Sequence, residues 1–356
     1  MNHLNKIREQ LHKYNIQAML ITSEPGEAYA IGFRGEGVVL VTEDECVYYT
    51  DSRYTEAAER QVTGCTVKTI GGGKNHLALA QEDVARLGLT RIGIQEEYLT
   101  LLSFNNWRKT LGEGVTLVPA GGLVADLRAS KDEEELALMR QAQAITDRTF
   151  TEILNHVKEG VTEQEIAALI TYYHMKFGAS KNSFDPIVAS GPNGSMPHAI
   201  PSEKKIQKGE FVTMDFGSIY GGYCSDMTRT VAVGQPTEEM ERVYNIVAKA
   251  QLLGIAAAHA GAIGCEVDKA ARDYIAAEGY GNCFGHGLGH SLGLEIHEDP
   301  GFRGGCKTAI PAGAVVSVEP GIYLPGKFGV RIEDVVVVGE GGCEVLTKSP
   351  KQLIVL

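Results

Sequence analysis

The sequence predicts two domains, an α/β domain over residues 1–122 and a second domain over residues 123–356. Three observations predict this division. With 356 residues, the chain is long for a single hydrophobic core. Its first third alternates between helix and strand patterns, whereas the remainder carries long helices and strands that end in carboxylates. Between them, the stretch PAGGLVADLRAS at 119–130 has the composition of a connector.

The first domain alternates helices and strands along its length. Leu4, Ile7, Leu11 and Tyr14 share one face of a helix. After it, the patterns predict strands at 18–22, 38–41, 46–49, 91–94 and 116–119 and helices at 54–62, 77–87 and 101–111. We find no set of candidate catalytic residues in this domain, so we expect the active site in the second domain.

Two helices open the second domain. One is predicted over 131–156, where an acidic first turn suits the positive end of the helix dipole. The other is predicted over 162–177, because Thr162 and Glu165 have the spacing of a capping box. Further along, the patterns predict a strand at 183–190, helices at 237–259 and 266–278, and strands at 314–318 and 330–338.

The composition argues against several classes of protein. A net charge of −12 argues against a nucleic-acid partner, which needs a basic face. Seven scattered cysteines with no CxxC pair predict no disulfide framework and a reducing compartment, the cytoplasm. The charged, amphipathic start of the sequence predicts no signal peptide. We also expect no membrane partner, because no apolar run approaches the roughly 18 residues that a membrane span needs.

Two aspartates in the segment VTMDFGSIYGGYCSDMTRT carry the most specific signal. Apolar runs flank Gly221 and Gly222, which is typical of a β-hairpin. A turn at that point places Asp215 and Asp226 opposite each other, to within about one residue. Two opposed carboxylates repel, so the pairing predicts a cation between them.

Three further residues complete a possible metal-ligand set. Glu319 follows an apolar strand, and Glu333 lies in a second strand, two residues after Arg331 on the same predicted face. There the guanidinium can orient the carboxylate. His290 lies in the glycine-rich segment GHGLGHSLG, which also fits a loose phosphate-binding pattern but lacks a matching strand and an acidic ribose partner. Four carboxylates and one imidazole form an oxygen-rich set suited to two divalent ions.

A group of histidines surrounds these candidate ligands. His286, His290 and His297 fall within twelve residues, which indicates a site rather than chance. His198 lies in a loop between two prolines, just ahead of the acidic hairpin. We therefore expect these side chains near the same centre.

Together these motifs resemble the creatinase/methionine-aminopeptidase superfamily of pita-bread metallopeptidases, and most of all its proline-specific branch, prolidase and aminopeptidase P. The resemblance runs nearly end to end. It implies an α/β N-terminal creatinase-like domain followed by an α+β pita-bread catalytic domain. It also implies two divalent metal ions, with Mn favoured among Mn, Co, Zn and Fe. Their ligands would be Asp215, Asp226, His290, Glu319 and Glu333.

The resemblance implies a role for each remaining site residue. A hydroxide bridging the two metals would attack the peptide carbonyl, and His198 or His297 would stabilise the oxyanion. Glu319 would carry a proton to the leaving nitrogen, and Arg331 would support the last glutamate. The residues expected to contact substrate are His198, His286 and His297.

The implied substrate is an Xaa-Pro bond, in a dipeptide or at the N-terminus of a short peptide, and a homodimer is expected. Because that bond has no N–H, a pocket shaped for the proline ring must supply recognition. The choice between dipeptidase and aminopeptidase stays open. One alternative is a methionine aminopeptidase, which would not normally carry the first domain. The others are a metal-free creatinase-type enzyme and a silent binding member of the fold, both expected to have lost ligands.

Overall fold

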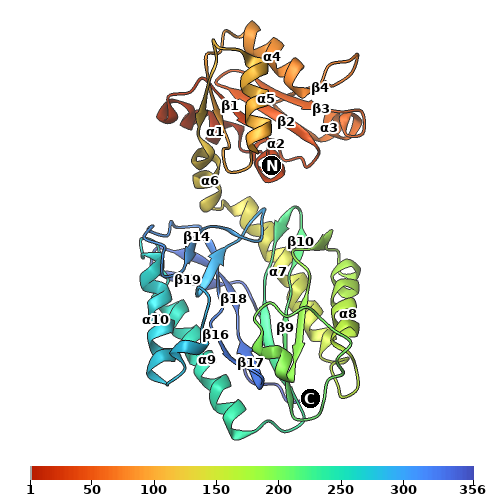
Figure 1. Cartoon of the computed structure of the whole chain (residues 1–356), viewed down its shortest axis with the longest axis vertical. Helices are drawn as coiled ribbons and strands as arrows, with labels where there is room; N and C mark the ends of the chain where they lie inside the picture. The colour runs from red at the N-terminus through yellow and green to blue at the C-terminus, as the bar shows by residue number, and fades with distance from the viewer. Residues whose placement is uncertain (1) are drawn as a thin grey trace. The chain divides into compact units, whose positions relative to one another are not determined.

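The computed structural model describes residues 2–356, and the chain divides into two compact units (Figure 1). The N-terminal unit is Met1–Arg128 and the C-terminal unit is Ala129–Leu356. The division falls inside helix α6 (Gly121–Ala129), later than the boundary expected after residue 122.

Helix α6 also corrects the expectation of a loop-like connector at 119–130. Most of that stretch is helical, although it opens with two glycines, which are poor helix formers. Leu123 and Val124 are both about 1% exposed. Packing of these apolar side chains therefore outweighs the weak helix propensity of the segment.

The N-terminal unit is an α/β fold built on one six-stranded sheet with the order β4-β3-β2-β1-β5-β6. Strands β1 and β2 run antiparallel, whereas β1 and β5 run parallel, so the sheet is mixed. Its strands are β1 (Ala18–Ile21), β2 (Gly37–Thr42), β3 (Cys46–Thr50), β4 (Thr66–Thr69), β5 (Arg91–Ile94) and β6 (Thr116–Pro119). Its helices are α1 (Leu4–Gln10), α2 (Glu24–Ile31), α3 (Thr55–Gln61), α4 (His76–Arg86) and α5 (Leu101–Leu111), with a 3₁₀ turn η1 (Leu11–Tyr14).

The expected strands and helices of this unit are confirmed, and α2 and β4 are additional. Helix α2 begins after Ser23, whose side chain accepts a hydrogen bond from the backbone of Gly26, and ends at Gly32 in the left-handed region. It is buried nearly all round, so it lacks the apolar periodicity that marks a surface helix. One face of the sheet packs on α4 and α5, and the only tryptophan, Trp107, lies in that core.

Two cysteines of this unit form a disulfide, although the sequence predicted no disulfide framework. Parallel pairing of β3 and β4 aligns Val47 with Thr66. The preceding residues, Cys46 and Cys65, are thereby brought side by side and form a disulfide. The other five cysteines are free.

The C-terminal unit repeats one arrangement, a pair of helices packed on a group of strands. Helices α7 (Glu133–Ile153) and α8 (Glu163–Lys176) share a core with the strands β8 (Ile187–Ser190), β9 (Glu210–Asp215) and β12 (Thr228–Val233). Helices α9 (Glu238–Ala257) and α10 (Gly264–Ala277) share another with β15 and β18. In Figure 1 the first helix pair is yellow to green and the second is cyan. Both halves therefore present strands toward the middle of the unit.

These strands form four small sheets rather than one large one. The orders are β12-β9-β8, β11-β10-β7, β14-β13-β15-β18-β19 and β16-β17. The bounds are β7 (Lys181–Asn182), β8 (Ile187–Ser190), β9 (Glu210–Asp215), β10 (Ser218–Tyr220), β11 (Tyr223–Cys224), β12 (Thr228–Val233), β13 (Gly289–Ser291), β14 (Glu298–Phe302), β15 (Val315–Val318), β16 (Gly321–Leu324), β17 (Phe328–Arg331), β18 (Asp334–Gly339) and β19 (Gly342–Val345), with 3₁₀ turns η2 (Gly191–Ser195) and η3 (Gly281–Cys283).

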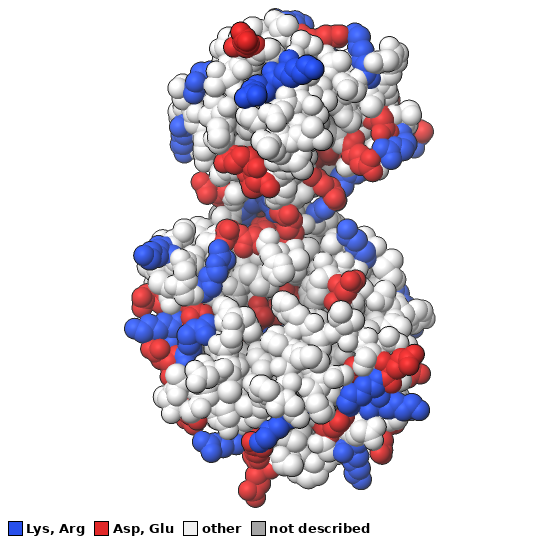
Figure 2. All heavy atoms as spheres, in the orientation of Figure 1, with Lys and Arg blue, Asp and Glu red and all other residues white. Residues whose placement is uncertain are grey.

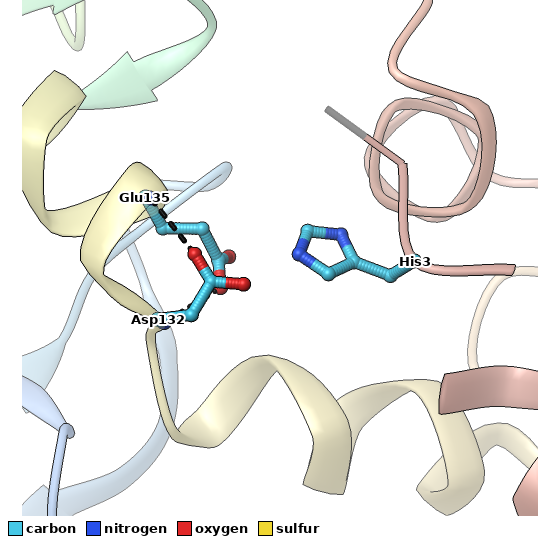
Figure 3. A group of neighbouring side chains, drawn as sticks. All are labelled: His3, Asp132 and Glu135. Atoms are coloured by element: carbon cyan, nitrogen blue, oxygen red, sulfur yellow. Dashed lines mark hydrogen bonds between the residues drawn. The ribbon is translucent and has the colours of Figure 1, made fainter. Parts of the chain in front are cut away.

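The capping box expected at α8 is present, and α7 has one that was not predicted. In α7, the backbone N–H of Asp132 donates to Glu135, and that of Glu135 donates to Asp132 (Figure 3). In α8, Thr162 and Glu165 exchange the same pair of bonds. Each box satisfies backbone donors that the first turn of a helix leaves unpaired.

Two expected strands of this unit are partly wrong. The stretch 330–338 is not one strand, because β17 pairs with β16 whereas β18 pairs with β15 and β19. The chain changes sheets at Ile332 and Glu333. The strand expected at 183–190 is shorter, because β8 begins only after Pro186, which has no N–H to donate.

Charged side chains of both signs are mixed over the visible face of each unit (Figure 2). The exposed ion pairs of the chain include Arg140–Glu344 and Lys327–Glu239. Each such pair contributes little to stability in water. Among the described residues, the helices are all too short or too polar to traverse a lipid bilayer.

Glu27 predicts a measurable pH dependence for the N-terminal unit. Its side chain accepts hydrogen bonds from Gly35 N at 2.7 Å and Tyr48 Oη at 2.7 Å, yet burial raises its pKa to about 7. Between pH 4.5 and 7 the folded state therefore binds more protons than the unfolded state, so stability falls as pH rises.

We expect Glu27→Gln, which cannot ionise, to unfold at a higher urea concentration than the wild type at pH 8. A tenfold difference in the acid dissociation constant of Glu27 between the folded and unfolded states corresponds to about 1.4 kcal/mol. The substitution should therefore raise the free energy of unfolding by at most about 3 kcal/mol. Fluorescence of Trp107 in the same unit reports the transition. Glu24→Gln, at an exposed position of the same helix, is the control and should change little. A gain at pH 4.5 as large as that at pH 8 would contradict the prediction.

Candidate metal centre

The acidic hairpin forms with its turn at the expected glycines. Gly221 and Gly222 both have positive φ, 57° and 89°, which a two-residue hairpin turn requires. Ile219 pairs with Cys224, and the same register further along the two strands pairs Asp215 with Thr228. Asp226 therefore lies two residues away from the position opposite Asp215, whereas the sequence predicted a distance of no more than about one residue. An even offset keeps both carboxylates on one face, as diagonal neighbours.

A third carboxylate joins this pair from the end of the chain. Oxygens of Asp215, Asp226 and Glu333 lie within 4.8 Å of one another, and all three residues are buried. Glu333 is held there by Thr228, whose backbone C=O accepts from Glu333 N at 3.1 Å and whose Oγ1 donates to Glu333 Oε2 at 2.7 Å. The change of sheets after β17 is what brings Glu333 to the hairpin.

His290 and Glu319 close the other side of the group. His290 Nε2 lies 3.5 Å from Asp226 Oδ2 and 3.3 Å from Glu319 Oε1. His290 Nδ1 lies 3.2 Å from the C=O of Ser291, so Nδ1 carries the proton of the neutral ring. The lone pair of Nε2 then points at two carboxylates. All five expected ligand positions, from distant parts of the sequence, meet in one place.

The electrostatics of the group favour a bound cation. Burial, together with the neighbouring carboxylates, raises the pKa of Asp226 and Glu333 well above the usual range. Burial also raises the pKa of Glu319 and lowers that of His290. One oxygen each of Asp215, Asp226 and Glu333 is buried with no hydrogen-bond partner among the described residues. Such groups are costly unless paired, and oxygen-rich sets of this kind suit divalent ions.

Arg331 supports a different ligand from the one expected. It is 3% exposed, and its Nη2 donates to Asp215 Oδ2 at 2.6 Å. Its other nitrogens donate to Thr228 Oγ1 at 3.0 Å, Tyr323 Oη at 2.9 Å and the C=O of Pro197 at 3.3 Å. Because β17 and β18 belong to different sheets, Arg331 and Glu333 do not share a strand face. The guanidinium therefore orients Asp215 rather than Glu333.

A pocket opens above the carboxylates, with the four predicted histidines in its wall. Burial lowers the pKa of His286 and of His297, so both rings are neutral near pH 7. The rings of His290 and His297 meet edge to face with centroids 4.4 Å apart. The remaining lining is largely apolar and includes Phe184, Ile187, Pro197, Ala199, Ile200, Pro201 and Ile296.

Sequence reasoning missed several residues of this site. Tyr323 connects Arg331 to His286, whose Nε2 lies 2.8 Å from the tyrosine oxygen. His286 Nδ1 lies 2.8 Å from the C=O of Gly287, so Nε2 accepts the tyrosine proton. Asp185 and Arg303, which line the pocket, were also not predicted. No local pattern marks these residues, because their positions depend on the pairing of strands far apart in the sequence.

Comparison with known proteins agrees with this geometry. Residues 137–340 match the model of metallopeptidase family M24, and residues 3–130 match that of the creatinase/prolidase N-terminal domain. This chain belongs to metallopeptidase family M24. It is 33% identical over 356 residues to an Xaa-Pro dipeptidase from Pyrococcus horikoshii, covering 99% of this chain and 98% of the relative.

Solved structures of M24 relatives superpose closely on this chain. One is an Xaa-Pro dipeptidase from Bacillus anthracis, 41% identical with a TM-score of 0.95 and 99% of each chain covered. Another is an X-Pro aminopeptidase from Thermotoga maritima, 36% identical with a TM-score of 0.94 and 100% of each chain covered. The expected fold, a creatinase-like domain followed by a pita-bread catalytic domain, is confirmed. These relatives favour the proline-specific branch over the methionine aminopeptidase and silent alternatives.

Removal of the Arg331 guanidinium should destabilise the metal-free protein. In Arg331→Met, Asp215 remains buried beside two carboxylates without its counter-charge, and breaking a buried ion pair in this way costs about 3–5 kcal/mol. The measurement is thermal unfolding by circular dichroism at pH 8 in the presence of EDTA. The control is Arg303→Met, since Arg303 lines the same pocket but pairs with an exposed aspartate. Equal melting temperatures for the two variants would contradict this expectation.

Proposed function

We propose that this chain hydrolyses the peptide bond before proline, in dipeptides or at the N-terminus of short peptides. Two divalent metal ions would be held by Asp215, Asp226, His290, Glu319 and Glu333. The observation that carries the proposal is the convergence of these five side chains. Three of them, Asp215, Asp226 and Glu333, are buried and have an oxygen with no hydrogen-bond partner among the described residues. Relatives named Xaa-Pro dipeptidase that align over nearly the whole chain support the substrate class.

The chemistry divides between the bound ions and the side chains around them. Divalent ions in such a site supply Lewis acidity and lower the pKa of water toward neutrality, which provides the nucleophile. His198 and His297 line the pocket and can donate a hydrogen bond to the developing oxyanion. Glu319 lies beside His290 in the group, so its carboxylate is placed to take up a proton and deliver it to the proline nitrogen.

Recognition of proline depends on shape rather than on a hydrogen bond to the scissile nitrogen. An Xaa-Pro bond has no N–H, so a donor at that position cannot be required of the substrate. The apolar wall formed by Phe184, Ile187, Pro201 and Ile296 provides a surface for a pyrrolidine ring. His286, held by Tyr323, would complete the substrate-binding set with His198 and His297.

We further propose Mn²⁺ as the preferred ion, a homodimer, and a cytoplasmic location. Four carboxylates and one imidazole suit Mn²⁺, although Co²⁺, Zn²⁺ or Fe²⁺ can occupy similar sites. Five of the seven cysteines are free, as expected in a reducing compartment. In that compartment Cys46 and Cys65 would be thiols.

The direct test is hydrolysis of Ala-Pro, Ala-Pro-Ala and Met-Ala-Ser by metal-stripped protein before and after addition of Mn²⁺. We expect proline peptides to be cleaved only with metal. Cleavage of Ala-Pro alone identifies a dipeptidase, and cleavage of Ala-Pro-Ala an aminopeptidase. Cleavage of Met-Ala-Ser alone, or metal binding with no hydrolysis under Mn²⁺, Co²⁺ or Zn²⁺, would contradict the proposal.

A stability measurement tests the metal centre without any substrate. Because the pKa of Asp226 is raised, its ionised form is unfavourable in the metal-free fold at pH 8. Asp226→Asn should therefore raise the Tm of the metal-free protein, by roughly 2–4 °C for each kcal/mol of relieved repulsion. The same variant should lose the rise in Tm that Mn²⁺ gives the wild type. In the control Asp185→Asn, at an exposed carboxylate of the pocket, the response to Mn²⁺ should be unchanged.

A further inference from the structure

The loop that carries His198 is fixed by a buried carboxylate outside the pocket. This segment, residues 191–201, is called the His198 loop below and runs from the end of β8 to Ser202. We infer that Glu163, at the first position of α8, is the positioning residue that holds it. The inference rests on the proposed function, because His198 acts on substrate only if that function is correct.

Glu163 accepts hydrogen bonds from both ends of the His198 loop. At the first end, Glu163 Oε1 accepts from Ser190 N at 2.7 Å and Ser190 Oγ at 2.9 Å. At the second end, Oε2 accepts from Ser202 N at 3.1 Å and Ser202 Oγ at 2.6 Å. Between them, Asn193 Nδ2 lies 3.1 Å from each oxygen. One carboxylate thus ties together the start, the first turn and the end of the loop.

Helix capping does not account for this arrangement. In the same turn of α8, Glu165 completes the capping box with Thr162. The Glu163 carboxylate instead makes its hydrogen bonds to residues of the His198 loop and its flanks, and the residue is 0% exposed. A fully buried carboxylate is tolerated only when its lone pairs are satisfied, and these donors satisfy them. Lys204 reaches the same place, since its Nζ donates to Ser190 Oγ at 2.9 Å.

The opposite side of the loop is fixed by the metal centre. Arg331 Nη1 donates to the C=O of Pro197, the residue before His198, and Arg331 Nη2 donates to Asp215. Gly194 also lies against Gly329 of β17, so closely that a Cβ added to Gly329 would meet Gly194 O at 1.9 Å. The backbone next to His198 is thus held by the centre, whereas the ends of the loop are held by Glu163. The position of the imidazole depends on both attachments.

Glutamine cannot replace this carboxylate without loss. A carboxylate accepts at both oxygens, whereas an amide accepts at one and donates at the other. Whichever way the new amide were turned in Glu163→Gln, its NH₂ group would face the backbone N–H of either Ser190 or Ser202. One end of the loop would therefore lose the hydrogen bond from its backbone N–H. An imidazole displaced by about 1 Å can cost up to about a hundredfold in rate.

The experiment compares Glu163→Gln with Glu165→Gln in the full-length protein loaded with Mn²⁺. Glu165 lies in the same turn and also accepts from two donors, Thr162 N and Thr162 Oγ1, but does not touch the loop. We expect kcat/KM for Ala-Pro to fall about tenfold in Glu163→Gln and less than about threefold in Glu165→Gln. Hydrogen exchange measured by mass spectrometry should accelerate in residues 191–203 of Glu163→Gln only.

A double-mutant cycle separates positioning from general destabilisation. If Glu163 acts through His198, Glu163→Gln should add less than about a threefold loss in a His198→Ala background. An equal loss in both backgrounds, or unchanged exchange of the loop, would overturn the inference. If Glu163→Gln does not fold, Asn193→Ala removes two of the same hydrogen bonds and is judged by the same criteria.

The outcome remains informative if the proposed function fails. Should the wild type cleave no proline peptide, the proposed function is wrong, yet hydrogen exchange still decides whether Glu163 holds the loop. If exchange is faster in Glu163→Gln but no variant is active, Glu163 holds the His198 loop. Its role in positioning His198 for catalysis is then rejected. Normal activity with a loop that exchanges at the wild-type rate would reject the positioning role alone.

Discussion

The C-terminal unit depends on one unfavourable feature, the burial of several carboxylates close together. Asp215, Asp226 and Glu333 lie within 4.8 Å of one another, shielded from water, and only Asp215 has a guanidinium beside it. Like charges at such distances in a poorly solvated site repel strongly. The hairpin turn, the change of sheets before Glu333 and the burial of Arg331 all serve to hold this group together. A bound cation offsets this repulsion, because each of the carboxylates is attracted to it.

Around this centre, polar contacts hold the loop segments in place. Arg331 connects Asp215, Tyr323 and the backbone beside His198. Tyr323 in turn donates to His286 Nε2, because the Gly287 C=O holds the ring proton on Nδ1. The His286 imidazole is therefore oriented by a neighbour that itself has a second attachment. Such second attachments are what keep catalytic side chains in one geometry.

The candidate ligands could be singled out from the sequence because they carry local signals. Asp215 and Asp226 flank a glycine turn, and Glu319 follows a buried strand, so their elements could be placed without knowledge of distant residues. The predictions that were wrong concern features that depend on distant parts of the sequence. The split of 330–338 between two sheets, and hence the partner of Arg331, depends on which strands pair, and alternating apolar residues do not encode that choice. Helix α2 was missed because it is buried nearly all round, and α6 because it opens with two glycines, which are poor helix formers.

The separation of Asp215 from Arg331 has a consequence for how the protein is made. These two residues are 116 positions apart, and Glu333 is further still. A ribosome therefore releases the acidic hairpin long before the arginine that neutralises it and the glutamate that completes it. During that interval the two aspartates can remain in water, where repulsion between them is weak. The centre is thus a late product of folding, and a nascent chain cannot acquire its full metal-binding set until synthesis is nearly complete.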